Sequence, residues 1–217
     1  MCSNFNPIPK PDFALRYAHL LPEFEYKDHV FPLDDAPILL AQRDELVPVR
    51  ATFGLIPQWA KSADYGRRTY NARAETVATL PSYREAWRRR QRCLVPVRRF
   101  LEPSYETGRS AWWGIRRADD APFLLAGIWE TRRLPDARVQ RSFSLLTIAA
   151  AGHPIMQRFH APDDEKRTVV PIAEAAALAW LGAESEDDLR DLLRPFPAED
   201  YLAEPAAGPA PQISLFD

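Results

Sequence analysis

Short apolar and aromatic segments bounded by turn-forming residues are the feature that most limits how this chain can fold. They cover residues 47–53, 93–101, 111–115, 122–129 and 143–149, and they are rich in β-branched, aromatic and aliphatic side chains. Runs of this length and composition are typical of β-strands. The pattern therefore predicts a system of antiparallel strands.

Helical patterns are few and short. Ser82 followed by Glu85 has the spacing of a capping box, which predicts a helix running to Arg90. Ser185 followed by Asp188 marks a second helix start, with an end near Leu193, and residues 173–181 predict a third helix. These helices do not alternate regularly with the strands. We therefore expect an α+β fold, a curved antiparallel sheet or barrel-like core with peripheral helices, rather than a doubly wound one.

Length and composition favour one domain. A chain of 217 residues, 46% of them hydrophobic, can bury a full core of its own. Prolines outnumber glycines by 21 to 8, which indicates stiff connections. Proline and alanine dominate the last residues. We predict a domain over residues 2–204 and a flexible tail over residues 205–217.

The sequence has no apolar stretch long enough to span a bilayer, and its N-terminal segment lacks the hydrophobic core of a signal peptide. We expect a cytoplasmic protein and a monomer. The two cysteines lack metal-like spacing and the four histidines are scattered. These patterns argue against a disulfide framework, and we expect no metal and no other cofactor.

Charge is unevenly distributed, although the net charge is only −2. Residues 84–99 contain seven arginines and one acidic residue, Glu85, whereas residues 184–191 are acidic. A basic cluster on one face would attract phosphate groups. A run of arginines on a solvated helix is the plainer interpretation. Charge alone leaves both interpretations open.

Met1-Cys2 at the start of the chain carries distinctive chemistry. Removal of an initiator Met before a small residue would leave Cys2 with a free α-amine and a thiol on adjacent carbons. Their reference pKa values are about 8 and about 8.5, so each would be partly nucleophilic near neutral pH. The amine can form a Schiff base with an aldehyde, and the thiolate can then close a thiazolidine ring on the same carbon. The alternative is that a second-position cysteine is an ordinary residue.

A set of motifs accompanies Cys2 in a characteristic order. They are FGLIPQW at 53–59, NARAET at 71–76, RCLVP at 92–96, FLE at 100–102, GIWE at 127–130 and, after Leu146-Thr147, HPIM at 153–156 with His160. In this set, from Cys2 to about Ile172, the chain resembles the SOS response-associated peptidase family of abasic-site processing proteins. The resemblance implies a curved, largely β fold that binds single-stranded DNA, and with it an association with the nucleoid. It also implies capture of abasic sites by the N-terminal Cys as a thiazolidine cross-link, with lyase and autopeptidase activities.

The resemblance also assigns residues to the chemistry. Cys2 would be the nucleophile and Glu102 the general acid or base beside its amine, while His160 would move a proton to the sugar oxygen or the departing phosphate. Asn71 would accept from the Cys2 amine and donate to a sugar hydroxyl. We prefer His160 to its rival His153 because of its place after the HPIM segment.

Contacts to DNA follow from the same resemblance. Arg73 would clamp the phosphate beside the lesion, and Trp59 would stack on an exposed base. Ser3 and Asn4 stand where the family often has Gly and Arg, so Asn4 is the candidate DNA contact there. Phe53 and Pro103 also replace tryptophans of the family pattern. We read Cys93, inside an apolar segment, as a small buried hydrophobe rather than a second nucleophile.

The C-terminal residues Gln212-Ile213-Ser214-Leu215-Phe216 resemble the short peptides that dock bacterial repair proteins on the replication sliding clamp. Gln212, Leu215 and Phe216 would be the anchors in a hydrophobic groove. A fortuitous tail is the alternative.

Two other functions compete with abasic-site capture. One is an N-terminal-nucleophile hydrolase in which Cys2 attacks an amide bond. The other is a non-catalytic adaptor for single-stranded DNA or the clamp, in which the arginines of residues 84–99 supply the affinity.

Overall fold

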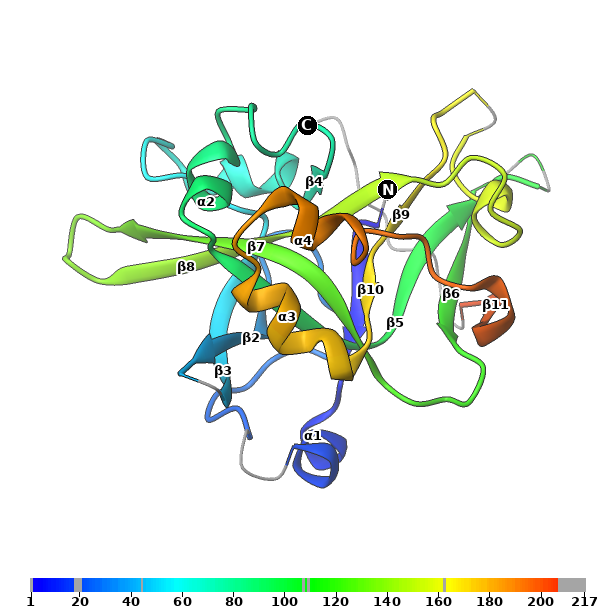
Figure 1. Cartoon of the computed structure of the whole chain (residues 1–217), viewed down its shortest axis with the longest axis horizontal. Coiled ribbons are helices and arrows are strands. Elements are labelled where there is room, and N and C mark those ends of the chain that lie inside the picture. Colours follow the sequence, from blue (N-terminus) through cyan, green and yellow to red (C-terminus); the bar gives the residue numbers. More distant parts are fainter. Residues whose placement is uncertain are drawn as a thin grey trace.

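The computed structural model describes residues 2–17, 21–43, 45–106, 108, 110–161 and 163–206 (Figure 1). The described elements are dominated by strands. In chain order the strands are β1 Asn4–Pro7, β2 Asp35–Gln42, β3 Glu45–Phe53, β4 Asn71–Arg73, β5 Arg92–Ser104, β6 Ala111–Arg117, β7 Phe123–Arg133, β8 Val139–Ala149, β9 Arg167–Val169, β10 Pro171–Ile172 and β11 Tyr201–Pro205. The helices are α1 Lys10–Arg16, α2 Arg84–Arg88, α3 Ala177–Gly182 and α4 Glu186–Arg190.

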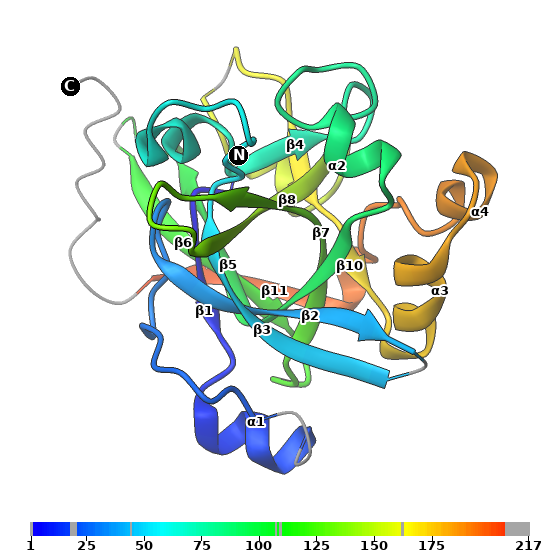
Figure 2. The same cartoon turned by 90° about the vertical axis from the view of Figure 1, so that its left-hand side faces the viewer.

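A closed barrel forms the centre of the molecule. β7 pairs with β8, β8 with β3, β3 with β2 and β2 with β5, and β5 pairs back to β7. All of these pairings are antiparallel except that of β3 with β8. β1 and β6 extend the sheet from β5, and β4 and β9 extend it from β8. The helices lie outside the barrel, with α3 and α4 on one side of it (Figure 2). The predicted α+β class with a barrel-like core is confirmed.

Aromatic side chains fill the barrel. Phe5, Phe53 and Phe143 are fully buried, and the rings of Phe53 and Phe143 stack with centroids 5.2 Å apart. Such ring pairs contribute about 0.5–1.5 kcal/mol each beyond the burial of their area. A second cluster packs the helices on the outside of the barrel, where Trp180 of α3 is fully buried and donates from Nε1 to the carbonyl of Cys93. Alternation along β5 supplies both clusters, because Val95 faces inward and Leu94 faces the helices.

The predicted strands are confirmed, and most of them are longer than expected. The helix predictions fare less well. Ser82 does not cap α2, because its hydroxyl hydrogen-bonds to the hydroxyl of Tyr65 at 2.8 Å and the helix begins at Arg84. The predicted capping box at that position is therefore wrong. The box at Ser185 and Asp188 is confirmed, although α4 ends at Arg190.

Two other boundaries differ from the prediction. The segment predicted as one helix over residues 173–181 is a 3-10 turn, Glu174–Ala176, followed by α3. β11 includes Pro205, and the backbone N–H of Ala206 donates to the carbonyl of Trp112 at 2.9 Å. The folded part therefore extends past the predicted boundary at 204. Gln212, Leu215 and Phe216 lie outside the described residues.

Within the described part of the chain, no helix has both the length and the apolar character needed to cross a membrane. The same residues include no group of three or more His, Cys, Asp or Glu side chains that could hold a metal ion.

A glycine fixes the chain where β3 leaves the barrel. Gly54 has a φ of +105°, and a Cβ on it would lie 2.2 Å from the carbonyl oxygen of Gly66. Only a residue without a side chain fits there, because the contact is with backbone. This close approach positions the segment that carries Trp59.

We expect Gly54→Ala to lower the free energy of unfolding by at least about 2 kcal/mol, since it adds both strain at positive φ and a backbone clash. Urea denaturation measures the effect. Gly182→Ala is the matched control, because a Cβ at Gly182 meets nothing within 4 Å. Equal stability of the two variants would contradict this view of the turn.

Candidate active site

Pairing of β1 with β5 places the start of the chain. Asn4 lies opposite Leu101, so the residues before Asn4 run beside Glu102 and Pro103. Cys2 has no exposed surface, and its thiol donates a hydrogen bond to the carbonyl of Asn4 at 3.3 Å. The register of one short strand thus brings a nucleophile to a carboxylate.

Glu102 and His160 form the next part of the site. The two side chains are buried, and Nε2 of His160 lies 3.1 Å from Oε2 of Glu102. The backbone N–H of His160 donates to the carbonyl of Pro103 at 3.0 Å, which ties the histidine to the residue after Glu102. His160 has a φ of +65°. This left-handed conformation is uncommon for residues other than glycine, and it aims the imidazole at the carboxylate.

Asn71 reaches the same place from β4, which is held in parallel pairing on β8. Its Nδ2 donates to the carbonyl of Cys2 at 2.7 Å. This differs from the predicted use of Nδ2 on a sugar hydroxyl. Oδ1 of Asn71 and Nδ1 of His160 are buried without a hydrogen-bond partner among the residues that the structure describes. Buried polar atoms of this kind are usually satisfied by water or by a ligand, so both remain available to one.

The electrostatics of the site change the expected behaviour of the thiol. Burial raises the pKa of Cys2 far above its usual value, and the negative charge of Glu102 raises it further. The thiol is therefore protonated at neutral pH. The expectation of a partly ionised thiol used the reference value of an exposed group and concerned a chain without Met1, whereas this pKa belongs to the chain that retains it.

Tyr70 was missed by the sequence analysis. It packs its ring edge-on against Phe53 with centroids 5.8 Å apart, and its pKa is raised by burial and further by the neighbouring Glu102 carboxylate. The phenol therefore lies near the acidic residue of the site. Its only signal in the sequence is that it precedes Asn71.

The three residues predicted to contact DNA lie in different environments. Arg73 is half exposed and its Nη1 is 2.9 Å from Oε2 of Glu165. Trp59 is 55% exposed and meets Tyr65 edge-on at 5.0 Å. Asn4 has no exposed surface, and neither Oδ1 nor Nδ2 of its side chain has a hydrogen-bond partner among the described residues. This placement does not suit the surface contact expected of Asn4.

The rival residues have structural roles. Nε2 of His153 lies 2.8 Å from the carbonyl of Phe196, and Nδ1 accepts from the backbone N–H groups of Ile155 and Met156 at 3.2 Å each. Both nitrogens are thus engaged. Cys93 is fully buried in the core, which confirms its predicted character.

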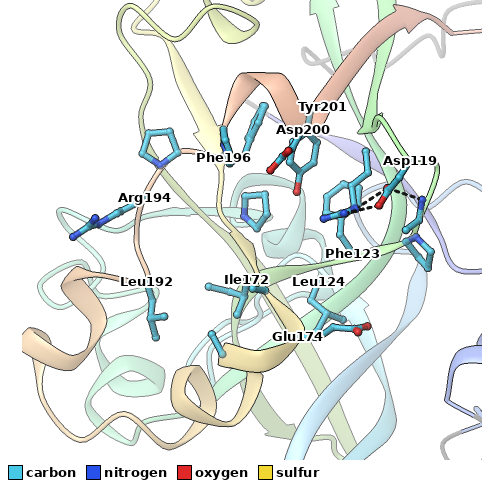
Figure 3. Close-up of a pocket in the computed structure, with 18 of the residues that line it drawn as sticks. Asp119, Phe123, Leu124, Ile172, Glu174, Leu192, Arg194, Phe196, Asp200 and Tyr201 are labelled. Carbon is cyan, nitrogen blue, oxygen red and sulfur yellow. Dashed lines mark hydrogen bonds and ion pairs between the residues drawn. The ribbon is translucent and has the colours of Figure 1, made fainter.

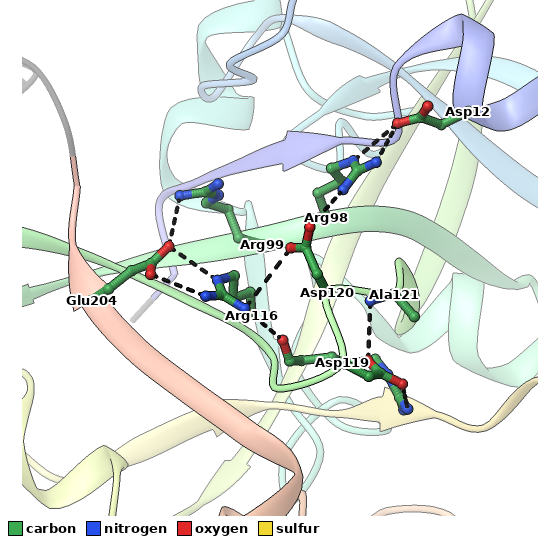
Figure 4. Close-up of polar contacts among 9 residues, drawn as sticks. Asp12, Arg98, Arg99, Arg116, Asp119, Asp120, Ala121 and Glu204 are labelled. Carbon is green, nitrogen blue, oxygen red and sulfur yellow. Dashed lines mark hydrogen bonds and ion pairs between the residues drawn. The ribbon is translucent and has the colours of Figure 1, made fainter.

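The arginines of residues 84–99 do not form one basic face. Arg92 is buried and donates to the carbonyl of Ala183 at 2.6 Å. Figure 4 shows Arg98 paired with Asp12 and Asp120, and Arg99 paired with Glu204. On α2, Arg88 and Arg89 both face Glu85. Acidic partners that are distant in sequence neutralise much of the cluster. The interpretation of these arginines as one basic face that attracts phosphate groups therefore loses support.

A hollow of about 610 Å³ lies elsewhere, between the ends of β7, β10 and β11 (Figure 3). Apolar side chains such as Leu124, Ile172 and Phe196 share its lining with charged ones such as Arg194. None of Cys2, Asn71, Glu102 and His160 lines it.

Comparison with known proteins gives the site its context. A family model described as SOS response associated peptidase (SRAP) matches residues 1–207. Two Bacillus subtilis proteins, called abasic site processing proteins YoqW and YobE, are each 26% identical over 211 residues. The alignment with YoqW covers 94% of this chain and 91% of YoqW, and that with YobE covers 94% and 93%.

Solved structures agree with the family match. A crystal structure of a protein from Bordetella bronchiseptica superposes with a TM-score of 0.85 at 28% identity, covering 94% of this chain and 99% of that one. A second, from Bacteroides thetaiotaomicron, gives 0.76 at 24% identity, covering 93% and 90%, and shows the shared fold alone. Because the family match spans nearly the whole sequence and the barrel is shared with these structures, the chain belongs to the SOS response associated peptidase family.

Proposed function

We propose that this protein processes abasic sites in single-stranded DNA by capturing them covalently on Cys2 once Met1 has been removed. One observation carries the proposal. Cys2, Asn71, Glu102 and His160 come from separate segments of the chain, and the fold brings them to one place. Family membership and the names of YoqW and YobE support DNA containing abasic sites as the substrate.

The chemistry begins at the ring-opened sugar. The amine nitrogen of Cys2 attacks the aldehyde carbon C1′, and the carbonyl oxygen takes a proton to give a carbinolamine. Loss of one water molecule leaves an iminium ion. The sulfur then adds to C1′, the C=N electron pair returns to nitrogen, and the thiol proton passes to a base. The product is a thiazolidine, with one water released overall.

Burial and the order of steps fit each other. A protonated thiol does not compete for the aldehyde, so the amine acts first. In the ring-closing step Glu102 accepts the thiol proton, while His160 moves protons at the sugar oxygen and at the departing water. Asn71 holds the Cys2 carbonyl through Nδ2, and its free Oδ1 accepts from the new amine. This fixed approach geometry is a source of rate enhancement.

DNA contacts complete the proposal. Arg73 binds the phosphate beside the lesion through its half-exposed guanidinium, and Trp59 stacks on a neighbouring base, an interaction worth about 1–3 kcal/mol. The iminium intermediate also allows β-elimination of the 3′ phosphate, which is a lyase reaction. The proposed peptidase activity is hydrolysis of the Met1–Cys2 peptide bond by the protein itself, which exposes the amine of Cys2.

The central prediction concerns Cys2. Wild-type protein mixed with a single-stranded oligonucleotide bearing one abasic site should give a species that survives denaturation, and Cys2→Ala should give none. Cys2→Ala and Cys2→Ser both keep the α-amine and lack the thiol, so each should form an imine that borohydride traps but no stable ring. Denaturing gel electrophoresis detects all three results.

The same gel distinguishes abasic-site capture from the two rival functions. An N-terminal-nucleophile hydrolase and a non-catalytic adaptor both predict no covalent species with any variant. A cross-link that persists in Cys2→Ala without borohydride would show that the thiol of Cys2 is not needed for the reaction.

A second prediction concerns His160. We expect His160→Asn to slow cross-link formation at least tenfold, roughly the lower range of general acid–base effects, without weakening binding to undamaged DNA. Asn suits the test because it tolerates positive φ. Single-turnover cross-linking kinetics give the rate constant.

His153→Asn is the control for that experiment, since it removes a buried imidazole whose two nitrogens hydrogen-bond to backbone groups. It should lower the melting temperature and leave the rate constant of the folded protein unchanged. Equal cross-linking rate constants for His160→Asn and wild type would show that His160 does not transfer protons in the reaction.

A third prediction concerns the C-terminal residues. We propose that Gln212, Leu215 and Phe216 bind the bacterial sliding clamp and bring the protein to replication forks. Deletion of residues 212–217 should abolish capture of purified clamp in a pull-down and leave cross-linking to free oligonucleotide intact. Unchanged capture of the clamp would dispose of this assignment.

A further inference from the structure

Arg73 already has an anionic partner. It lies two residues after Asn71 on β4, so the two side chains emerge on the same face of the strand, while Ala72 between them is buried. Its Nη1 is 2.9 Å from Oε2 of Glu165, and both side chains are about half exposed. A carboxylate oxygen therefore occupies the place beside Nη1 that a phosphate oxygen would take.

Glu165 has a second cation that holds it. Its Oε1 lies 2.7 Å from Nη1 of Arg167. Arg167 is buried, and its Nη2 also pairs with Glu75 at 2.7 Å and donates to the carbonyl of Thr147 at 2.9 Å. Arg167 is thus fixed and neutralised without Glu165. Glu165 can release Arg73 and still keep a charged partner.

The backbone around Glu165 is also held. Nζ of Lys166 donates to the carbonyls of Phe159 at 3.0 Å and Ala161 at 2.8 Å. This ties Lys166, the residue after Glu165, to the turn that carries His160. The ion pair with Arg73 consequently joins the two segments that carry Asn71 and His160.

We propose that Glu165 is a built-in competitor for the phosphate site of Arg73, and that a phosphodiester of the DNA strand displaces its carboxylate. This inference rests on the proposed function, in which Arg73 binds the DNA backbone. Displacement breaks a half-exposed ion pair, which is weak in water, and leaves a negative charge near the phosphate. Both effects lower the affinity for undamaged DNA, so lasting attachment depends on the covalent bond to the lesion.

Fluorescence anisotropy with a labelled, undamaged oligothymidine tests the competition on the full-length protein. We expect Glu165→Gln to lower Kd about three- to tenfold, since it frees one guanidinium for one phosphate. Asp164→Asn is the matched control, because it removes an exposed charge from the same segment, and its Kd should stay within about twofold of wild type.

A double variant links the gain to Arg73. In an Arg73→Gln background, the effect of Glu165→Gln should shrink to that of Asp164→Asn. Glu165→Asp, which keeps the charge on a shorter side chain, should bind with intermediate affinity and covers the case in which Glu165→Gln is unstable.

Two results would overturn the inference: a Kd for Glu165→Gln equal to or above that of wild type, or a gain that persists without Arg73. Measurable binding by wild type together with either result leaves the proposed function standing. Absence of wild-type binding to single-stranded DNA would instead refute the proposed function, and the inference with it.

Discussion

Pairing of β1 with β5 is the contact on which the site depends. Only a few residues of β1 follow Cys2, yet their register against β5 sets which groups the thiol meets. Phe5, opposite Phe100, anchors that register in the aromatic core, because both rings are fully buried. A slip of one residue would move Phe5 to the other face of the sheet and take Cys2 away from Glu102. The barrel core and the site are therefore specified by the same contacts.

The site combines burial with unsatisfied polar atoms. Oδ1 of Asn71 and Nδ1 of His160 lack hydrogen-bond partners within the described part of the chain, at a free-energy cost of about 1–3 kcal/mol for each such group. A bound sugar or water would recover that cost. Burial and the neighbouring Glu102 also raise the pKa of the Cys2 thiol. In the proposed reaction the α-amine would therefore act first, and proton transfer from the thiol would control ring closure.

The sequence predicts β5, β7 and β8 well, because each contains a long apolar run that is recognisable as a strand without knowledge of its pairing partner. The strands that were not predicted are β1, β2, β4, β9, β10 and β11. Short segments such as Asn71–Arg73 become strands only by pairing with β8. The cap at Ser82 failed for a similar reason, because the hydroxyl of Tyr65 competes for Ser82. Pairing partners distant in sequence decided each of these cases.

The site shows the same division. The chemistry of an N-terminal Cys follows from its covalent structure, and the structure brings Cys2, Asn71, Glu102 and His160 together, although their roles stay predictions. Burial of the thiol, the involvement of Tyr70 and the ion pair of Arg73 with Glu165 depend on packing between distant segments, which periodicity and motifs do not encode.

Intact mass spectrometry of the protein after reaction with an abasic oligonucleotide tests the central claim most directly. The account predicts an adduct whose mass equals the chain without Met1 plus the oligonucleotide minus one water molecule, with peptide mapping to Cys2. An adduct on a chain that retains Met1, or one that maps to any other residue, would contradict it.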